Sequence, residues 1–395
     1  MTQPPLSPSV DRARAQAANA RAMAALRVGD APAAILAARE AANADPGALS
    51  LWINLALACR MGGDAAGERE ALERALDLDR LDFTAQLRMA QLLQREGEET
   101  KALIAWNGVR QLAQQFPGLP DAVLAELAAG ETFCAGLRAR LAAATRAAVA
   151  GAGDTLDETE RRRIGAFTGI ALGERRLYVN ECAGLHYPFL PSDEFFDSRH
   201  FPWFVTLEAA AGVIRGELEA LLAEPGEAIR PYVRMEPGSP DNKWTPLDGS
   251  LDWSACFLWE YGVPNAAVID RCPETARVLE SLPLARIPGR APNAFFSMLR
   301  PHSRIPAHTG VTNTRAIVHL ALDVPPGCGF RVGGETREWM EGKAFAFDDT
   351  IEHEAWNDSD ARRAVLIIDA WNPHLSEAEC RAITAYFKAT DAALG

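Results

Sequence analysis

Two of the chain's histidines fall at the ends of predicted strands. The chain has 7 histidines, and four of them lie between residues 302 and 353. His308 follows Ile305-Pro-Ala, in a predicted turn just before a strand, and His353 comes just after one. Neutral imidazole binds Fe(II) well, and a site with few protein ligands leaves coordination positions open. We therefore expect His308 and His353 to hold a metal, although a lone histidine more often has a core or surface role.

The segments around these histidines alternate between polar and apolar residues, as half-buried strands do. A hairpin turn is expected at Gly333-Gly334. Many short antiparallel strands predict a jelly roll, that is, a double-stranded β-helix, with flanking helices. The expected strands are 293–299, 315–322, 343–347 and 363–369, and the expected covering helices are about 204–224 and 273–282.

Alternation decides which side chains share a face on these strands. On one strand Arg315, Ile317 and His319 share a face, and on the last strand Arg363 shares a face with Ile367. On a jelly roll, strand ends can meet at the mouth of the barrel. We therefore expect the two histidines to be brought together there.

The first part of the chain is helical and repeats itself. Residues from about 10 to 150 are rich in Ala, Leu, Arg and Glu, with apolar positions every three to four residues. Ala22, Ala56 and Ala90 recur at a spacing of 34, the period of tetratricopeptide repeats. Residues 120–150 could supply a capping helix. A plain helical bundle with chance alanine periodicity is the alternative.

Composition divides the chain and narrows its function. We expect a repeat domain over 10–150 and a second, β-rich domain over 155–395, which makes a multidomain protein of α plus β class. The net charge of −13 argues against a nucleic-acid partner. No run of 18 apolar residues predicts a membrane span. The start of the chain does not look like a secretory signal, and the seven cysteines are scattered, so we expect a cytoplasmic protein.

Taken together, the motifs of the β-rich half resemble the aspartyl/asparaginyl β-hydroxylase family. The close match covers about residues 290 to 375, and a looser one, including Trp253, extends back towards 190. Some members of this family also carry tetratricopeptide repeats ahead of the catalytic domain. The matching motifs are His308-Thr-Gly-Val-Thr-Asn-Thr-Arg-Ala-Ile-Val-His-Leu320, Phe347-Asp-Asp-x-x-Glu-His-Glu-x-Trp-Asn357 and Arg363…Ile368-Asp-Ala-Trp-Asn-Pro373.

The resemblance implies that His308 and His353 are the iron ligands. Most related oxygenases have a carboxylate two residues after the first histidine, and this chain has Gly310 there. That glycine matches the family pattern, in which two histidines suffice and water fills the gap. Asp348 and Asp349 are candidates for a supporting carboxylate that orients a ligand or a bound water.

The resemblance also implies where a cosubstrate and a substrate bind. Arg363 would hold the distal carboxylate of 2-oxoglutarate, assisted by Ser297, because a guanidinium can grip a carboxylate with two hydrogen bonds. His319 would lie near the carboxylate end that chelates iron, and Arg315 would contact the substrate carboxylate. Some members have a further arginine where this chain has Ile317, which alters these contacts.

The implied activity is that of an Fe(II)- and 2-oxoglutarate-dependent dioxygenase. It would use O2 to hydroxylate the β-carbon of an Asp or Asn residue in a peptide or protein, which the helical repeats could recruit. One alternative keeps these cofactors but takes a free amino acid, a biosynthetic peptide or an acyl chain. The other is a non-catalytic repeat adaptor, against which the presence of His308, His353 and Arg363 together argues.

Overall fold

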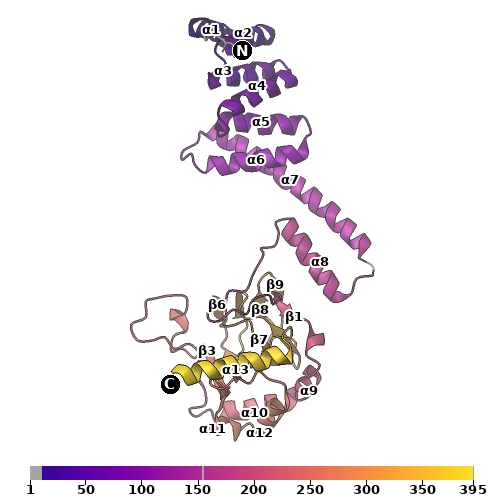
Figure 1. The fold of residues 1–395 in the computed structure, drawn as a ribbon, viewed down its shortest axis with the longest axis vertical. Helices are drawn as coiled ribbons and strands as arrows, with labels where there is room; N and C mark the ends of the chain where they lie inside the picture. Colours follow the sequence, from indigo (N-terminus) through magenta and orange to yellow (C-terminus); the bar gives the residue numbers. More distant parts are fainter. Residues whose placement is uncertain (1–10, 154, 395) are drawn as a thin grey trace, which may run out of the picture. The chain divides into compact units, whose positions relative to one another are not determined.

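The computed structural model describes residues 11–153 and 155–394. These residues belong to two compact units, 1–155 and 156–395, which are described separately. The first unit is helical, and the second combines two antiparallel sheets with helices (Figure 1). This is the mixed α and β class that the sequence predicts.

The first unit consists of helical hairpins that repeat along the chain. The second helices of successive hairpins begin at Ala31, Ala65 and Glu99, a spacing of 34 residues, so the predicted tetratricopeptide-like repeats are confirmed. A long helix follows them, as expected for the capping segment. The helices are α1 (Arg12–Arg27), α2 (Ala31–Ala44), α3 (Leu49–Met61), α4 (Ala65–Leu78), α5 (Phe83–Arg95), α6 (Glu99–Ala113) and α7 (Asp121–Ala152).

The same local rule forms the turn of each hairpin. A glycine with positive φ follows the first helix at Gly29 (+79°), Gly63 (+72°) and Gly97 (+73°), a conformation that glycine adopts without steric penalty. In the first two hairpins the next residue, Asp30 or Asp64, accepts a hydrogen bond from the backbone N–H three residues on. This cap satisfies one of the free N–H groups of the second helix.

Small residues let the helices of each hairpin approach closely. Ala22, Ala56 and Ala90 are at most 3% exposed. Glu68 departs from the pattern, because it is buried where a small residue is usual. Its carboxylate accepts a hydrogen bond of 2.6 Å from the Arg95 guanidinium. The pairing compensates the buried charge of Glu68. Removing one partner of a buried ion pair typically costs roughly 3–5 kcal/mol, because the other charge is then left buried alone.

Two antiparallel sheets form the framework of the second unit. The 8-stranded sheet has the order β1-β10-β7-β12-β5-β3-β2, with β4 paired to β3, and the 4-stranded sheet has the order β6-β11-β8-β9. The strands are β1 (Phe195–Phe196), β2 (Arg230–Pro231), β3 (Trp253–Glu260), β4 (Val263–Pro264), β5 (Ala294–Leu299), β6 (Ser303–His308), β7 (Arg315–Asp323), β8 (Cys328–Val332), β9 (Glu335–Arg337), β10 (Ala344–Phe347), β11 (His353–Asn357) and β12 (Arg363–Trp371).

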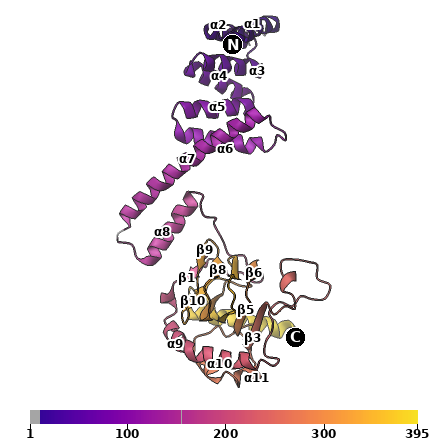
Figure 2. The same ribbon diagram turned by 180° about the vertical axis from the view of Figure 1, so that it is seen from behind.

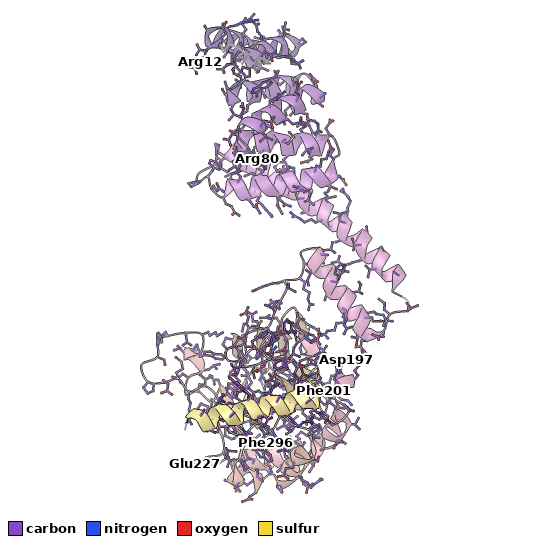
Figure 3. All side chains as sticks on the ribbon, in the orientation of Figure 1. Arg12, Arg80, Asp197, Phe201, Glu227 and Phe296 are labelled. Atoms are coloured by element: carbon purple, nitrogen blue, oxygen red, sulfur yellow. The ribbon has the colours of Figure 1, made fainter. Side chains whose placement is uncertain are left out.

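Helices cover the outer face of the large sheet. In both views α9 to α12 gather on one side of the strands (Figures 1 and 2). Their apolar side chains pack on alternate residues of the strands, including Phe296, which is labelled in Figure 3. The helices of this unit are α8 (Glu158–Ala171), α9 (Phe204–Ala209), α10 (Ala211–Ala223), α11 (Ala266–Ile269), α12 (Pro273–Ser281) and α13 (Glu377–Leu394), with short 3-10 turns at Ser198–His200 and Thr245–Leu247.

The inner faces of the two sheets meet in a second core. Phe347 and Val365 of the large sheet pack with Phe330 and Val332 of the small one. The remaining inward-facing residues line a cavity between the sheets. None of the described helices is long and apolar enough to cross a membrane.

Candidate active site

The two predicted metal ligands lie side by side. His308 is the last residue of β6 and His353 is the first residue of β11, and these residues are directly opposite each other in the small sheet. Their ring centroids are 4.1 Å apart. The predicted turn at His308 is wrong, because this residue ends β6. His353 follows the strand that ends at Phe347, as expected, but it also begins β11, which was not predicted from the sequence. Because β6 and β11 are paired, the histidines form a cross-strand pair.

Both imidazoles are held with one nitrogen free. Nδ1 of His308 donates to the Pro306 carbonyl at 2.8 Å, and Nδ1 of His353 donates to the Ile351 carbonyl at 3.0 Å. With Nδ1 protonated, a neutral ring carries its lone pair on Nε2. Burial lowers the pKa of His308, and burial and the neighbouring His308 lower the pKa of His353. The pair is therefore neutral and able to donate electron pairs near pH 7.

Arg363 is a buried guanidinium with no carboxylate partner among the described residues. Its Nη1 donates to Ser297 Oγ at 3.3 Å, its Nε has no hydrogen-bond partner, and its charge lies 4.8 Å from the centre of the Trp339 ring. Burial lowers its pKa to about 10, which keeps the group charged at neutral pH. Ser297 in turn accepts a hydrogen bond from Trp253 Nε1 at 3.1 Å.

His319, on the inner face of β7, lines the same cavity as the histidine pair and Arg363. Trp339 Nε1 donates to His319 Nδ1 at 3.4 Å, so the neutral ring carries its proton on Nε2. Burial lowers the pKa of His319, and the positive charge of Arg363 lowers it further. The ring can therefore donate a hydrogen bond from Nε2 to an anion beside Arg363.

Asp349 occupies the space beside Gly310. A Cβ atom built at residue 310 would lie 2.0 Å from Asp349 Oδ2, so a longer side chain there and this carboxylate exclude each other. Asp349 Oδ1 is buried without a hydrogen-bond partner, and burial raises the pKa of this carboxyl to about 7. Asp348 is instead tied to Asn180 and Thr350 and does not line the cavity.

Arg315 is more exposed than Arg363 (13% for its side chain, against 1% for Arg363 as a whole), so we call its end of the cavity the outer end. Arg315 is paired with an acid. Its Nη1 donates to Asp369 Oδ2 at 2.7 Å, and both side chains are largely buried. The backbone N–H and the side-chain amide of Asn293 donate to the same oxygen. Ile317, on the strand next to Asp369, also faces the cavity. The sequence reveals Arg315 but not its partner.

The cavity has a volume of about 690 Å³, and the residues predicted to bind metal, cosubstrate and substrate line it. His308, His353, Ser297, Arg315, His319 and Arg363 all line it. The other four histidines do not; His302 pairs with Asp360, and His374 with Asp193.

Sequence reasoning missed Tyr232, Phe257 and Phe295 in the aromatic wall of the cavity. Tyr232 stacks on Trp253 with ring centroids 3.9 Å apart, and Trp244 meets His308 edge-on at 5.0 Å. Phe295 and Phe257 continue the wall with centroids 4.6 Å apart. The alternation of β3 and β5 could have placed Trp253, Phe257 and Phe295 inward. No local pattern marks Tyr232, which directly follows the two-residue strand β2.

Comparisons with known proteins relate the second unit to a family of hydroxylases. Residues 208–373 match the family described as aspartyl/asparaginyl beta-hydroxylase. The chain is 35% identical over 201 residues to the ornithine lipid ester-linked acyl 2-hydroxylase of Rhizobium tropici, which covers 50% of this chain and 67% of that protein. It is 37% identical over 192 residues to the aspartyl/asparaginyl beta-hydroxylase of Homo sapiens, which covers 47% of this chain but only 24% of that protein.

Among solved structures, similarity is found to the TPR2B-domain:pHsp70-complex of yeast Sti1. The match has 18% sequence identity and a TM-score of 0.29, and it covers 32% of this chain and 98% of that chain.

Proposed function

The chain belongs to the aspartyl/asparaginyl β-hydroxylase family, and on this basis we propose that its second unit is an Fe(II)- and 2-oxoglutarate-dependent hydroxylase. His308 and His353 would hold the iron through Nε2. Arg363 and Ser297 would hold the distal carboxylate of 2-oxoglutarate. When bound, the iron and the cosubstrate would supply the oxidising chemistry with O2, and the products would be succinate, CO2 and a hydroxylated substrate.

The paired histidines carry the metal part of this proposal. Both rings are oriented by backbone carbonyls, the arrangement that fixes the tautomer of a ligating imidazole. Among the described residues no group of three or more His, Cys, Asp or Glu side chains is placed to hold a metal. A metal bound here would therefore have two protein ligands, with the remaining positions open to water, cosubstrate and O2.

The buried Arg363 carries the cosubstrate part. A charged group removed from water without a counter-ion is costly, and a carboxylate bound here would provide that counter-ion with two parallel hydrogen bonds. Its Nε, buried and unpaired, is one of the donors available. Arg363 and Ser297 are far apart in sequence, and the direct pairing of β12 with β5 brings them together.

The other side chains have supporting roles in this scheme. His319 would donate a hydrogen bond from Nε2 to the cosubstrate. Trp253 would hold Ser297 in place through its own hydrogen bond to the hydroxyl. Asp349 would accept a hydrogen bond from a water molecule on the metal. The aromatic wall would limit the access of bulk water to the reacting atoms.

Two substrate classes are candidates. The first is an Asp or Asn residue in a peptide, positioned near Arg315. The second is an acyl group, favoured by the apolar Ile317 and Ile367 in the cavity wall and by the 67% coverage of a relative named as an acyl 2-hydroxylase. The chain spans about a quarter of the human relative, so the substrate of that protein is a candidate here and no more.

The direct test is turnover by the full chain. Protein reconstituted with Fe(II) under argon is mixed with 2-oxoglutarate, air-saturated buffer and either Asn- and Asp-containing peptides or acyl amides. We expect succinate that requires iron and O2 and is lost in His308→Ala. His302→Asn is the matched control, because His302 is exposed and lies outside the cavity. Absence of both succinate and iron-dependent 2-oxoglutarate binding would contradict the proposal.

A further inference from the structure

Some of the arginines that line the cavity have an acidic partner and others do not. Four arginines line it: Arg230, Arg234, Arg315 and Arg363. Arg363, at the inner end, has no acidic partner among the described residues, whereas Arg315 is paired with Asp369 and Arg230 with Glu260. Arg234 is exposed at the mouth, where solvent screens its charge. Among the described residues that line the cavity, no buried cation other than Arg363 therefore lacks a counter-ion.

The pairing of Arg315 is built into the sheet. Asp369 and Ile317 are direct neighbours on β12 and β7, and Asn293 from the end of β5 fixes the carboxylate from the other side. Three donors reach Oδ2 of Asp369: the backbone N–H of Asn293, its side-chain amide, and Nη1 of Arg315. A substrate carboxylate approaching Arg315 would have to lie beside the buried Asp369 carboxylate, which repels it.

A continuous aromatic surface runs along one wall of the same cavity. We call it the aromatic ledge, and it consists of Trp253, Tyr232, Phe295 and Phe257. Tyr232 is nearly parallel to Trp253 (3.9 Å, 20°) and to Phe295 (5.5 Å, 30°). Phe295 is nearly parallel to Phe257 (4.6 Å, 26°). The ledge begins at Trp253, which contacts Ser297, and ends at Phe257 beneath Arg230.

The strand register places apolar residues next to the ledge. Ile367 of β12 lies between Phe295 of β5 and His319 of β7, and it lines the cavity together with Ile317. The space between the inner cation Arg363 and the outer pair of Arg315 and Asp369 is therefore bounded by aromatic rings and branched aliphatic side chains.

From this arrangement we propose that the substrate group held at the outer end is uncharged, an amide or ester rather than a carboxylate, and that an apolar or planar part of the substrate lies on the aromatic ledge. This inference rests on the proposed function, because it assigns Arg363 to the cosubstrate. It favours Asn over Asp among peptide substrates, and it is compatible with an acyl amide or ester.

The physical basis is the cost of burying an uncompensated charge. A carboxylate that leaves water for a site without a free cation loses its solvation and gains no full ion pair. A neutral amide loses less, and it can accept from the remaining N–H groups of Arg315. Contact with aromatic and aliphatic side chains contributes about 25 cal/mol for each Å² of apolar surface buried.

A pair of probes with the same shape and different charge tests this inference. 3-Phenylpropanamide and 3-phenylpropanoate are titrated into the full chain by calorimetry, with and without saturating 2-oxoglutarate to occupy Arg363. With 2-oxoglutarate present, the amide is expected to bind at least ~10-fold more tightly than the carboxylate, the scale expected for an uncompensated charge. Tyr232→Ala should weaken both probes without changing their ratio, because it removes contact area from the ledge and no charge; Tyr232 is 41% exposed.

The charge argument has its own variant and control. Ile317→Arg adds a cation beside Arg315 and should invert the preference, so that the carboxylate binds more tightly. Ile317→Met, of similar length and uncharged, should keep the preference for the amide. The inference is overturned if the carboxylate binds the wild type as tightly as the amide, if neither probe binds, or if Tyr232→Ala changes neither affinity. Failure of the proposed function would show separately, as absence of 2-oxoglutarate binding.

Discussion

The orientation of His308 and His353 depends on backbone carbonyls that the sequence alone does not identify. Each Nδ1 is bonded to the carbonyl of the residue two positions earlier, and each ring is therefore presented by its own strand end. A similar dependence holds for Arg363. The strands around it, and not its neighbours in sequence, leave it without an acidic partner among residues 11–153 and 155–394.

Arg363→Lys tests how the cosubstrate is held. Lysine keeps the charge but offers a point charge in place of two parallel hydrogen bonds. We expect the Kd for 2-oxoglutarate to rise by roughly 10- to 100-fold, the loss of about 1.4–2.8 kcal/mol. Arg362→Lys is the matched control, since Arg362 is exposed and lies outside the cavity. Equal affinities in the two variants would contradict the assigned role.

Asp349 makes the stability of the metal-free protein depend on pH. Burial raises its pKa from 3.8 to about 7 in the folded state. The bound proton therefore stabilises the fold fully below about pH 4, and this contribution is lost as the pH rises through about 7. Relative to Asp349→Asn, the thermal midpoint of the wild type should fall as the pH rises from about 5 to about 8. The buried histidines, whose lowered pKa acts in the opposite sense, are common to both proteins. Superimposable profiles for the two proteins would rule this out.

At the scale of elements, hydrophobic periodicity predicted much of the architecture. Period-2 alternation placed Arg315, Ile317 and His319 on one face of β7, which is where the structure has them. The expected helices at 204–224 and 273–282 correspond to α9, α10 and α12. The Gly333-Gly334 turn joins β8 to β9 as predicted.

Pairing between strands was harder to predict, because register depends on contacts far apart in sequence. Asp369 lies 54 residues from Arg315, and nothing local to either residue indicates that they form an ion pair. The placement of His308 failed for the same reason, since β6 continues to the histidine only because β11 pairs with it. Trp253 likewise reaches Ser297 through the pairing of β3 and β5.

The helical repeats offer a test of packing at the level of one element. In α7, a Cβ atom at Gly130 would lie 2.4 Å from the Trp106 ring of α6, whereas at Gly136 it would meet nothing within 4 Å. Gly130→Ala should destabilise the repeat unit by about 1–3 kcal/mol through overpacking. Gly136→Ala should be neutral or stabilise it by up to about 1 kcal/mol. Chemical denaturation followed by circular dichroism decides, and equal effects would contradict the packing of α7.

For the whole molecule, the hydrophobic cores divide by unit. The cores of the first unit contain only residues between 15 and 134, and those of the second only residues between 195 and 383. Units with separate cores commonly unfold in separate steps. A change that stabilises or destabilises one unit is therefore expected to leave the unfolding of the other unit unchanged.

Calorimetric unfolding of the full chain checks this division. Cobalt(II) with 2-oxoglutarate should raise the transition temperature of the second unit only. The free energy of unfolding of that unit should increase by about 2.7 kcal/mol at a ligand concentration 100 times Kd. Gly130→Ala should lower only the transition of the first. A single transition that both changes move together would show that the units unfold as one.

The most direct test of the central assignment is an anaerobic titration of the Fe(II)-loaded full chain with 2-oxoglutarate, followed by the visible charge-transfer band that a 2-oxo acid gives on chelating iron. The wild type should develop the band at one iron per chain. His308→Ala and His353→Ala should lose it, and His302→Asn should keep it. A band of full intensity in either of the first two variants, or no band in the wild type, would contradict the assignment of His308 and His353 as the metal ligands.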